Sequence, residues 1–201
     1  MPIPPENLDK ASQPELQKIL LQSMSAPGRD HTAVENSLND YVLHRDNMIK
    51  MVDMAERLKC GLPTLIMGEA GCGKTFLVRL AAKFMGIEIM EESVHAGTTV
   101  DDIARAIDKA EVKAQELENQ NNQRDSPFVL LFFDELNTCS HLPIFKRLLI
   151  DRLHPQRQDS VHPHLRFVGA CNPWRTAGKE EVRRPTVYQF ARDLVSLVIL
   201  P

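Results

Sequence analysis

A glycine-rich segment at residues 68–75, with the sequence GEAGCGKT, constrains this chain more than any other feature. It follows the apolar run Thr64–Met67 and opens a stretch with helical spacing, Lys74–Met85. Glycines allow successive backbone N–H groups to face one anion, and the N-terminus of the following helix attracts the same negative charge. The pattern G-x-x-x-x-G-K-T between a strand and a helix therefore predicts a loop that binds a nucleotide phosphate. The alternative is a glycine-rich turn with an exposed lysine.

The chemistry of such a loop assigns a task to several of its residues. Lys74 is expected to reach the β- and γ-phosphates, and the Thr75 hydroxyl is expected to bind Mg²⁺. Cys72 lies within the loop, so bound nucleotide is expected to shield its thiol. The predicted nucleotide-binding residues form one continuous run: Gly68, Glu69, Ala70, Gly71, Cys72, Gly73, Lys74, Thr75 and Phe76.

Two carboxylates follow the most apolar stretch of the chain, residues 128–133. A run of six apolar residues without alternation is typical of a strand covered on both faces. Asp134 and Glu135 come directly after it, at the edge of a parallel sheet where ligands bind. We expect Asp134 to hold Mg²⁺ through water and Glu135 to orient and polarise an attacking water. A solvated acidic turn after a core strand is the alternative.

Asn172 occupies the corresponding position after another apolar stretch, residues 165–170. Its carboxamide is a candidate to contact the γ-phosphate or the attacking water. An Asn-Pro pair is also an ordinary start of a turn, so this signal depends on the other two motifs.

The order of the predicted elements indicates an α/β fold. Apolar strands at 64–67, 87–90, 128–133, 165–170 and 194–200 alternate with helical patterns at 45–59, 74–85, 99–118 and 142–153. Such alternation predicts a parallel sheet with helices on both faces. Residues 7–24 have helical spacing that Pro14 is expected to divide, and residues 25–40 are turn-rich. We therefore expect a helical or linker-like segment at 1–40 and a single α/β unit at 41–201.

Composition excludes several classes of protein. The formal net charge of −3 does not favour a nucleic-acid binder, which usually carries a basic stripe. The sequence has no apolar run of 18 residues, and its start lacks a secretory signal, so we expect no membrane span and a cytoplasmic location. Its four cysteines, at positions 60, 72, 139 and 171, form no C-x-x-C pair and are expected to be reduced thiols.

Three histidines, His154, His162 and His164, fall close together between prolines. A metal site is conceivable there, but no carboxylate or cysteine is placed to complete it. An exposed loop is the preferred interpretation of this segment.

The three motifs, taken in this order, resemble those of the AAA+ ATPases. Five stretches narrow the resemblance to the mysterin family of giant ring-finger E3 ubiquitin ligases, which carry dynein-like AAA+ modules: residues 59–75, 94–103, 130–138, 144–152 and 167–175. The resemblance runs from about Tyr41 to Arg175. The family usually has tyrosine at the position of Trp174 and alanine at that of Leu136; neither departure touches a catalytic role.

The resemblance implies a P-loop NTPase of AAA+ type, a three-layer core whose five-stranded parallel sheet has the order 5-1-4-3-2. It implies ATP and Mg²⁺ as ligands, and hydrolysis with Glu135, Lys74 and Asn172 as the catalytic residues. It also implies neighbouring AAA+ modules, in the same chain or another subunit, that supply an arginine finger, and an association with ubiquitination machinery.

Some features of the family are not found in the sequence. We expect these residues not to include the helical lid that usually follows the fifth strand in the family, and four scattered cysteines are not expected to form a ring finger. Arg183, Arg184 and Arg192 are finger candidates by position, although surface arginines explain them as well. Three alternatives therefore stay open: a truncated fragment that binds nucleotide without hydrolysis, a nucleic-acid-stimulated motor or loader, and a P-loop kinase.

Overall fold

The computed structural model describes residues 11–24, 44–120, 128–172 and 197–199. Several predictions lie outside these ranges. They concern the turn-rich segment 25–40, Trp174 and the candidate finger residues Arg183, Arg184 and Arg192.

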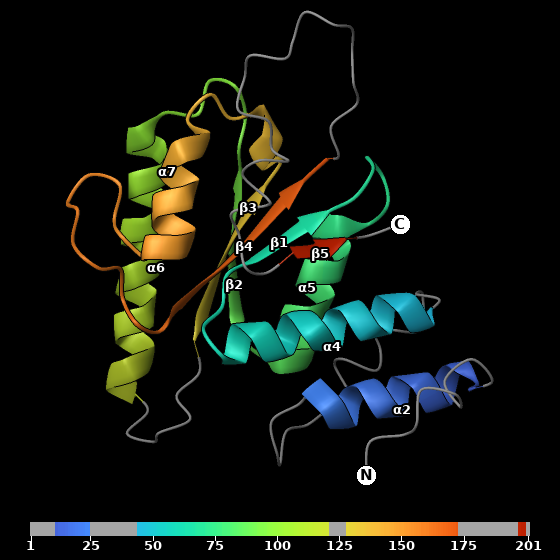
Figure 1. The fold of residues 1–201 in the computed structure, drawn as a ribbon. Coiled ribbons are helices and arrows are strands. Elements are labelled where there is room, and N and C mark those ends of the chain that lie inside the picture. The colour runs from blue at the N-terminus through green and yellow to red at the C-terminus, as the bar shows by residue number, and fades with distance from the viewer. Residues whose placement is uncertain (1–10, 25–43, 121–127, 173–196, 200–201) are drawn as a thin grey trace, which may run out of the picture.

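A parallel sheet forms the centre of the molecule (Figure 1). Strands β1 (Thr64–Met67), β2 (Glu88–Ser93), β3 (Val129–Asp134) and β4 (Leu165–Cys171) pair in the order β2-β3-β4-β1. The short segment β5 (Leu197–Ile199) pairs with β1 on its other side, in parallel, with Leu65 opposite Leu197. The predicted parallel α/β architecture is confirmed, because every pairing between these strands is parallel.

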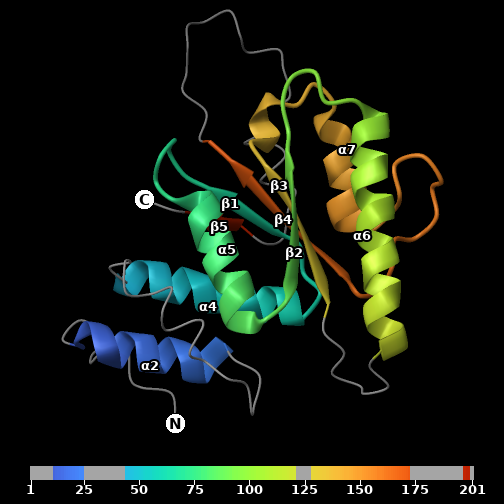
Figure 2. The same ribbon diagram turned by 180° about the vertical axis from the view of Figure 1, so that it is seen from behind.

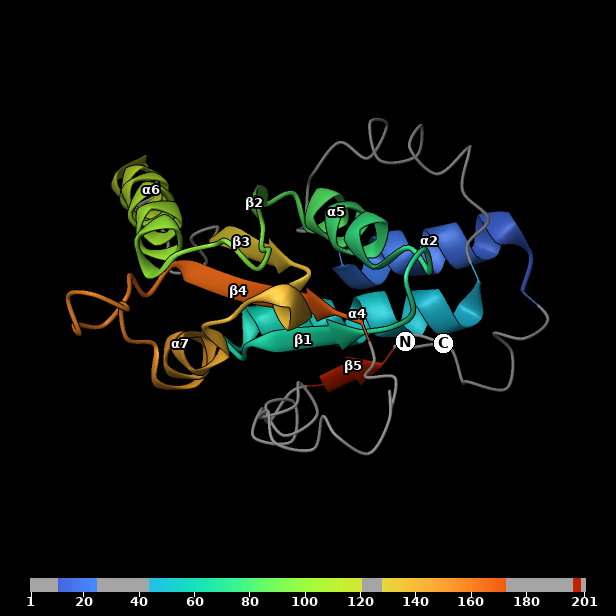
Figure 3. The same cartoon turned by 90° about the horizontal axis from the view of Figure 1, so that it is seen from above.

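Helices cover both faces of the sheet (Figures 1 and 2). One face carries α4 (Arg45–Lys59) and α5 (Lys74–Met85), on which α2 (Gln13–Met24) packs in turn, and the other face carries α6 (Val100–Gln120) and α7 (Leu142–Lys146). The view from above separates these layers (Figure 3).

Strand β3 shows how the sequence supplies both cores. Leu130 and Phe132 belong to the core that also contains side chains of α2, α4 and α5, whereas Leu131 and Phe133 belong to the core that contains side chains of α6 and α7. Successive side chains of a strand point to opposite faces, so an unbroken apolar run is what a doubly covered strand requires. All four side chains are at most 1% exposed.

The N-terminal helices differ slightly from the prediction. Helix α2 begins at Gln13 with Pro14 in its first turn, so Pro14 does not divide a helix in the described residues. Proline fits the first turn because its missing N–H would have no helical partner there. In α4, Met48, Met51 and Met54 are buried and belong to the core on this side of the sheet.

The segment before β4 departs furthest from the expected single helix at 142–153. Helix α7 ends at Lys146, and a π-helical turn, η2 (Arg147–Asp151), follows it. The helical path stops at Arg152, whose φ of 54° lies in the left-handed region. The Arg152 guanidinium donates to the carbonyl oxygens of His162 and Leu165, at 3.0 and 2.9 Å, which holds the end of this turn against the start of β4.

Candidate functional site

The glycine-rich loop joins the carboxyl end of β1 to the first residue of α5, as the sequence predicts. Gly71 and Gly73 have φ angles of 80° and 83°. An added Cβ would meet no atom within 4 Å at either position, so the left-handed backbone, and not lack of space, requires glycine. The loop therefore has the backbone path for which its glycines are needed.

Lys74 is almost buried, with 8% of its surface exposed, at the start of α5. Its Nζ donates to Gly68 O at 2.8 Å, Glu69 O at 2.9 Å and Asn172 Oδ1 at 2.8 Å. An ammonium group has three N–H donors, and here each has an acceptor. The ammonium is thus fixed between the loop and the end of β4.

Thr75 and Asp134 meet although 59 residues separate them. The Thr75 hydroxyl donates to Asp134 Oδ2 at 2.5 Å, and Asp134 Oδ1 accepts the backbone N–H of Glu135 at 2.9 Å. A hydroxyl and a carboxylate are hard oxygen ligands of the kind that Mg²⁺ prefers. The donor set at this point fits the predicted metal.

Glu135 has an unusual backbone conformation, with φ 58° and ψ 36°. Residues other than glycine rarely adopt this left-handed backbone conformation, and holding one in it costs about 1–3 kcal/mol. The turn that follows, η1 (Leu136–Thr138), fixes it: the Thr138 N–H and hydroxyl both bond Glu135 O, and the hydroxyl also bonds Val94 O. The Glu135 side chain is exposed at the same edge of the sheet.

Asn172 follows β4 and is half-buried. Its side chain contacts Lys74, and its backbone N–H donates to Asn137 Oδ1 at 3.0 Å. Sequence reasoning singled out Asn172 but missed Asn137. The signal available was the position of Asn137 two residues after Glu135, within a stretch that carries the family resemblance.

The remaining loop residues lie where the sequence places them, along one turn at the carboxyl edge of the sheet. Cys72 is half-buried, and its N–H donates to Glu69 O at 3.3 Å. Phe76 stands in the first turn of α5 with 43% of its surface exposed. Their contacts to nucleotide stay predictions.

Cys171, the last residue of β4, is fully buried next to this site. Burial raises the pKa of its thiol to about 12, although the positive charge of Lys74 acts in the opposite direction. The thiol is therefore neutral at physiological pH.

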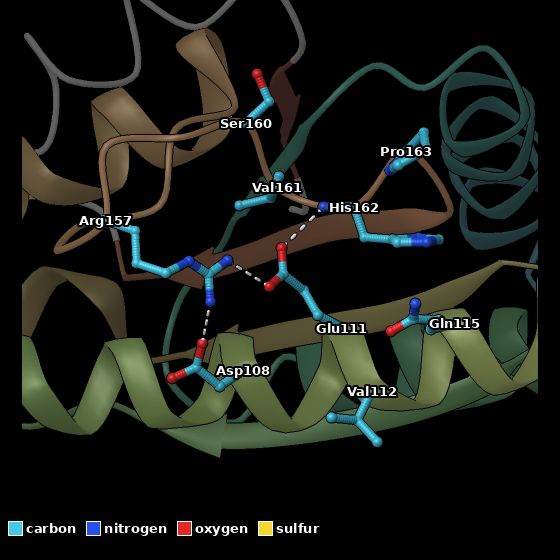
Figure 4. Close-up of a pocket in the computed structure, with 9 residues that line it drawn as sticks. All are labelled: Asp108, Glu111, Val112, Gln115, Arg157, Ser160, Val161, His162 and Pro163. Atoms are coloured by element: carbon cyan, nitrogen blue, oxygen red, sulfur yellow. Dashed lines mark hydrogen bonds and ion pairs between the residues drawn. The ribbon is translucent and has the colours of Figure 1, made fainter.

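A hollow of about 490 Å³ lies away from these residues, between α6 and the loop that precedes β4 (Figure 4). Arg157 reaches across it to Asp108 and Glu111, at 2.5 and 2.6 Å, and the N–H of His162 bonds Glu111. These contacts hold the loop on the helix surface.

The interpretation of this segment as an exposed loop is wrong for His154, which is only 1% exposed. Its Nδ1 accepts the N–H groups of Gln156 and Arg157, so the ring closes a turn. His162 Nε2 lies 3.1 Å from Glu118 Oε2. Among the described residues, no group of three or more histidine, cysteine and acidic side chains is placed to hold a metal ion.

Helices long and apolar enough to cross a bilayer do not occur in the described part of the chain.

Comparison with known proteins gives a consistent result. The family described as RNF213 AAA domain matches residues 41–175, the range of the resemblance seen in the sequence. The chain is 38% identical over 143 residues to the E3 ubiquitin-protein ligase rnf213-beta of Danio rerio, which covers 67% of this chain and 3% of that protein. It is 36% identical over 152 residues to E3 ubiquitin-protein ligase RNF213 of Homo sapiens and 35% identical over 153 residues to that of Mus musculus. Each match covers 72% of this chain and 3% of the relative.

The chain thus spans a small part of the length of the relatives it matches. The predicted mysterin-type resemblance is confirmed, because the family match covers more than half of the chain and contains all three motifs. By this match and by its identity to these relatives, the chain belongs to the RNF213 AAA domain family.

Proposed function

We propose that this chain binds Mg-ATP on the loop at 68–75 and hydrolyses it. The observation that carries the proposal is the meeting of three motifs at one sheet edge. Lys74 contacts Asn172, and Thr75 contacts Asp134, so side chains that follow β1, β3 and β4 converge. A glycine-rich turn with an exposed lysine would not require such contacts.

The roles follow from the chemistry of each group. The loop N–H groups, the α5 N-terminus and Lys74 bind the phosphates, with a phosphate oxygen replacing at least one acceptor of Nζ. Thr75 and Asp134 hold Mg²⁺, Asp134 through water. Bound Mg²⁺ neutralises charge on the β- and γ-phosphates.

Hydrolysis in this scheme depends on Glu135. Its carboxylate orients a water for in-line attack on the γ-phosphorus and takes up the proton that the water loses. The bond from phosphorus to the bridging oxygen of ADP breaks, so the products are ADP and inorganic phosphate. Asn172 positions the γ-phosphate or the attacking water beside Lys74.

The wider context is also proposed. The core is assigned as a three-layer AAA+ module with five strands in the order 5-1-4-3-2, in which a neighbouring module supplies an arginine finger. The relatives are named as E3 ubiquitin-protein ligases, and this chain corresponds to about 3% of their length. We infer that ATP hydrolysis drives conformational change in such a larger protein, and that ubiquitin transfer takes place outside these residues.

Phosphate release from Mg-ATP by the full 201-residue chain tests the proposal. Lys74→Ala should abolish both ATP binding and release, whereas Lys59→Ala, at an exposed ion pair on α4, should change neither. Binding without release would identify a non-hydrolysing fragment, and transfer to an added acceptor would identify a kinase. Release that requires added DNA or RNA would favour the motor or loader. Equal release by the wild type and Lys74→Ala would refute the proposal.

A further inference from the structure

Asn137 makes a contact that the proposed mechanism does not use. It lies in the turn η1, two residues after Glu135, and its side chain is half-buried. Its Oδ1 accepts the backbone N–H of Asn172 at 3.0 Å, across 35 residues of sequence. The bond joins the acidic turn after β3 to the end of β4.

This bond completes a chain of contacts from the lysine to the acidic turn. Lys74 Nζ donates to Asn172 Oδ1, and the Asn172 N–H donates to Asn137 Oδ1. Because the Asn137 side chain holds the Asn172 backbone, it restrains the direction in which the Asn172 carboxamide points. A carboxamide contributes to the binding and orientation of a γ-phosphate only when its own direction is fixed.

A second contact ties the same turn to β4. Leu136 is fully buried and packs directly on Gly169, where an added Cβ would overlap Leu136 Cδ1. The turn is therefore attached to β4 twice, by an apolar contact through Leu136 and by a hydrogen bond through Asn137. The two contacts consequently restrain the position of Asn172 relative to the turn that carries Glu135.

We propose that Asn137 is a positioning residue that aims Asn172 at the γ-phosphate and so makes the site distinguish a nucleoside triphosphate from a diphosphate. The inference rests on the proposed nucleotide binding at the loop. The γ-phosphate of a triphosphate extends to Lys74 and Asn172, whereas the phosphate chain of ADP ends one phosphate earlier. Loss of the Asn137 contact should therefore weaken binding of the triphosphate more than binding of the diphosphate.

Equilibrium binding of the non-hydrolysable triphosphate AMP-PNP and of ADP, both with Mg²⁺, provides the test. Loss of a net hydrogen bond corresponds to roughly a 3- to 10-fold change in an equilibrium constant. Asn137→Ala should lower the ratio of AMP-PNP affinity to ADP affinity by about this factor. Asn137→Leu, which keeps the branching at Cγ but removes the acceptor, should do the same. Ser140→Ala is the matched control, since Ser140 lies in the same segment and its hydroxyl contacts Ala96 O and His141.

A double-mutant cycle separates positioning from a general structural effect. If Asn137 acts through Asn172, Asn137→Ala combined with Asn172→Ala should lower the ratio no further than Asn172→Ala alone. Effects of the two substitutions that multiply would overturn the inference, as would an unchanged ratio in both Asn137 variants. A wild-type chain that binds AMP-PNP and ADP equally well would overturn it too.

The outcomes for the two proposals are distinguishable. The wild type could prefer AMP-PNP to ADP, and lose this preference in the Asn137 variants, without releasing phosphate from ATP. That result would contradict hydrolysis but support the role of Asn137. Phosphate release with unchanged discrimination in the Asn137 variants would contradict only the role of Asn137.

Discussion

Replacing Gly169 by alanine tests how closely the turn after Glu135 packs on β4. A Cβ at this position would lie well inside van der Waals contact with Leu136 Cδ1 and 3.0 Å from Leu65 Cδ1. Both leucines are at most 1% exposed, so neither can turn away into solvent. Gly169→Ala should therefore strain the core next to the site, although β4 is an extended strand that accepts alanine.

The magnitude follows from two opposing effects. Overpacking a core by one methyl group costs about 1–3 kcal/mol, and removing a strand glycine returns about 0.5–1 kcal/mol. We expect a loss of about 1–2 kcal/mol in the free energy of unfolding. Leu136→Ala alone should cost about 2–5 kcal/mol, since it empties a buried site.

The double variant gives the sharper result. The Cβ that Gly169→Ala adds would occupy part of the space left by Leu136→Ala, so the two costs should combine to less than their sum by about 1–3 kcal/mol. Urea denaturation of the wild type, the two single variants and the double variant measures this coupling, provided that the slope with urea is unchanged. Additive costs, or a stabilised Gly169→Ala variant, would refute the packing described for this turn.

Three further predictions concern other parts of the molecule. Mg-ATP should protect Cys72 from alkylation, measured by mass spectrometry, and equal labelling with and without nucleotide would mean that the loop is not occupied. Burial raises the pKa of the Cys171 thiol in the folded chain. As the pH rises, the unfolded chain therefore loses this proton before the folded chain does, at about pH 8.5. The free energy of unfolding should therefore be unaffected by this thiol at lower pH and should fall as pH rises toward about 12, more steeply in the wild type than in Cys171→Ala. If urea denaturation at alkaline pH gave the same fall in the free energy of unfolding with pH for both proteins, this prediction would be contradicted. Because Arg157 is 42% exposed, Arg157→Ala should lower the free energy of unfolding by only about 1 kcal/mol or less. Amide exchange at 155–162 should nevertheless accelerate, and unchanged exchange would exclude Arg157 as the residue that holds that loop on α6.

The parts of the structure that the sequence predicted are those that local chemistry decides. The bounds of β1 and α5 matched the prediction. Glycines with left-handed backbone, Gly71 and Gly73, lie in the loop between the two elements, and Gly86, with a φ of 62°, ends α5. The two-sided burial of β3 was evident from its unbroken apolar run.

Other parts depend on contacts that no local pattern reveals. The bond from Asn172 to Asn137 exists because β3 and β4 are neighbours, and its geometry depends on a turn held by long-range packing. Burial of His154 likewise requires the loop before β4 to lie on α6. A π-helical turn follows α7 where a regular helix was expected, and Arg152 at its end bonds the start of β4, a contact that no local pattern predicts.

The proposed mechanism depends most on Glu135 as the group that activates water. Steady-state phosphate release by wild type and Glu135→Gln, in preparations whose Mg-ATP affinity is measured in parallel, tests this claim most directly. Glu135→Gln should bind Mg-ATP within about twofold of wild type and should lose at least about 100-fold in phosphate release. Release by Glu135→Gln at the wild-type rate would contradict the mechanism.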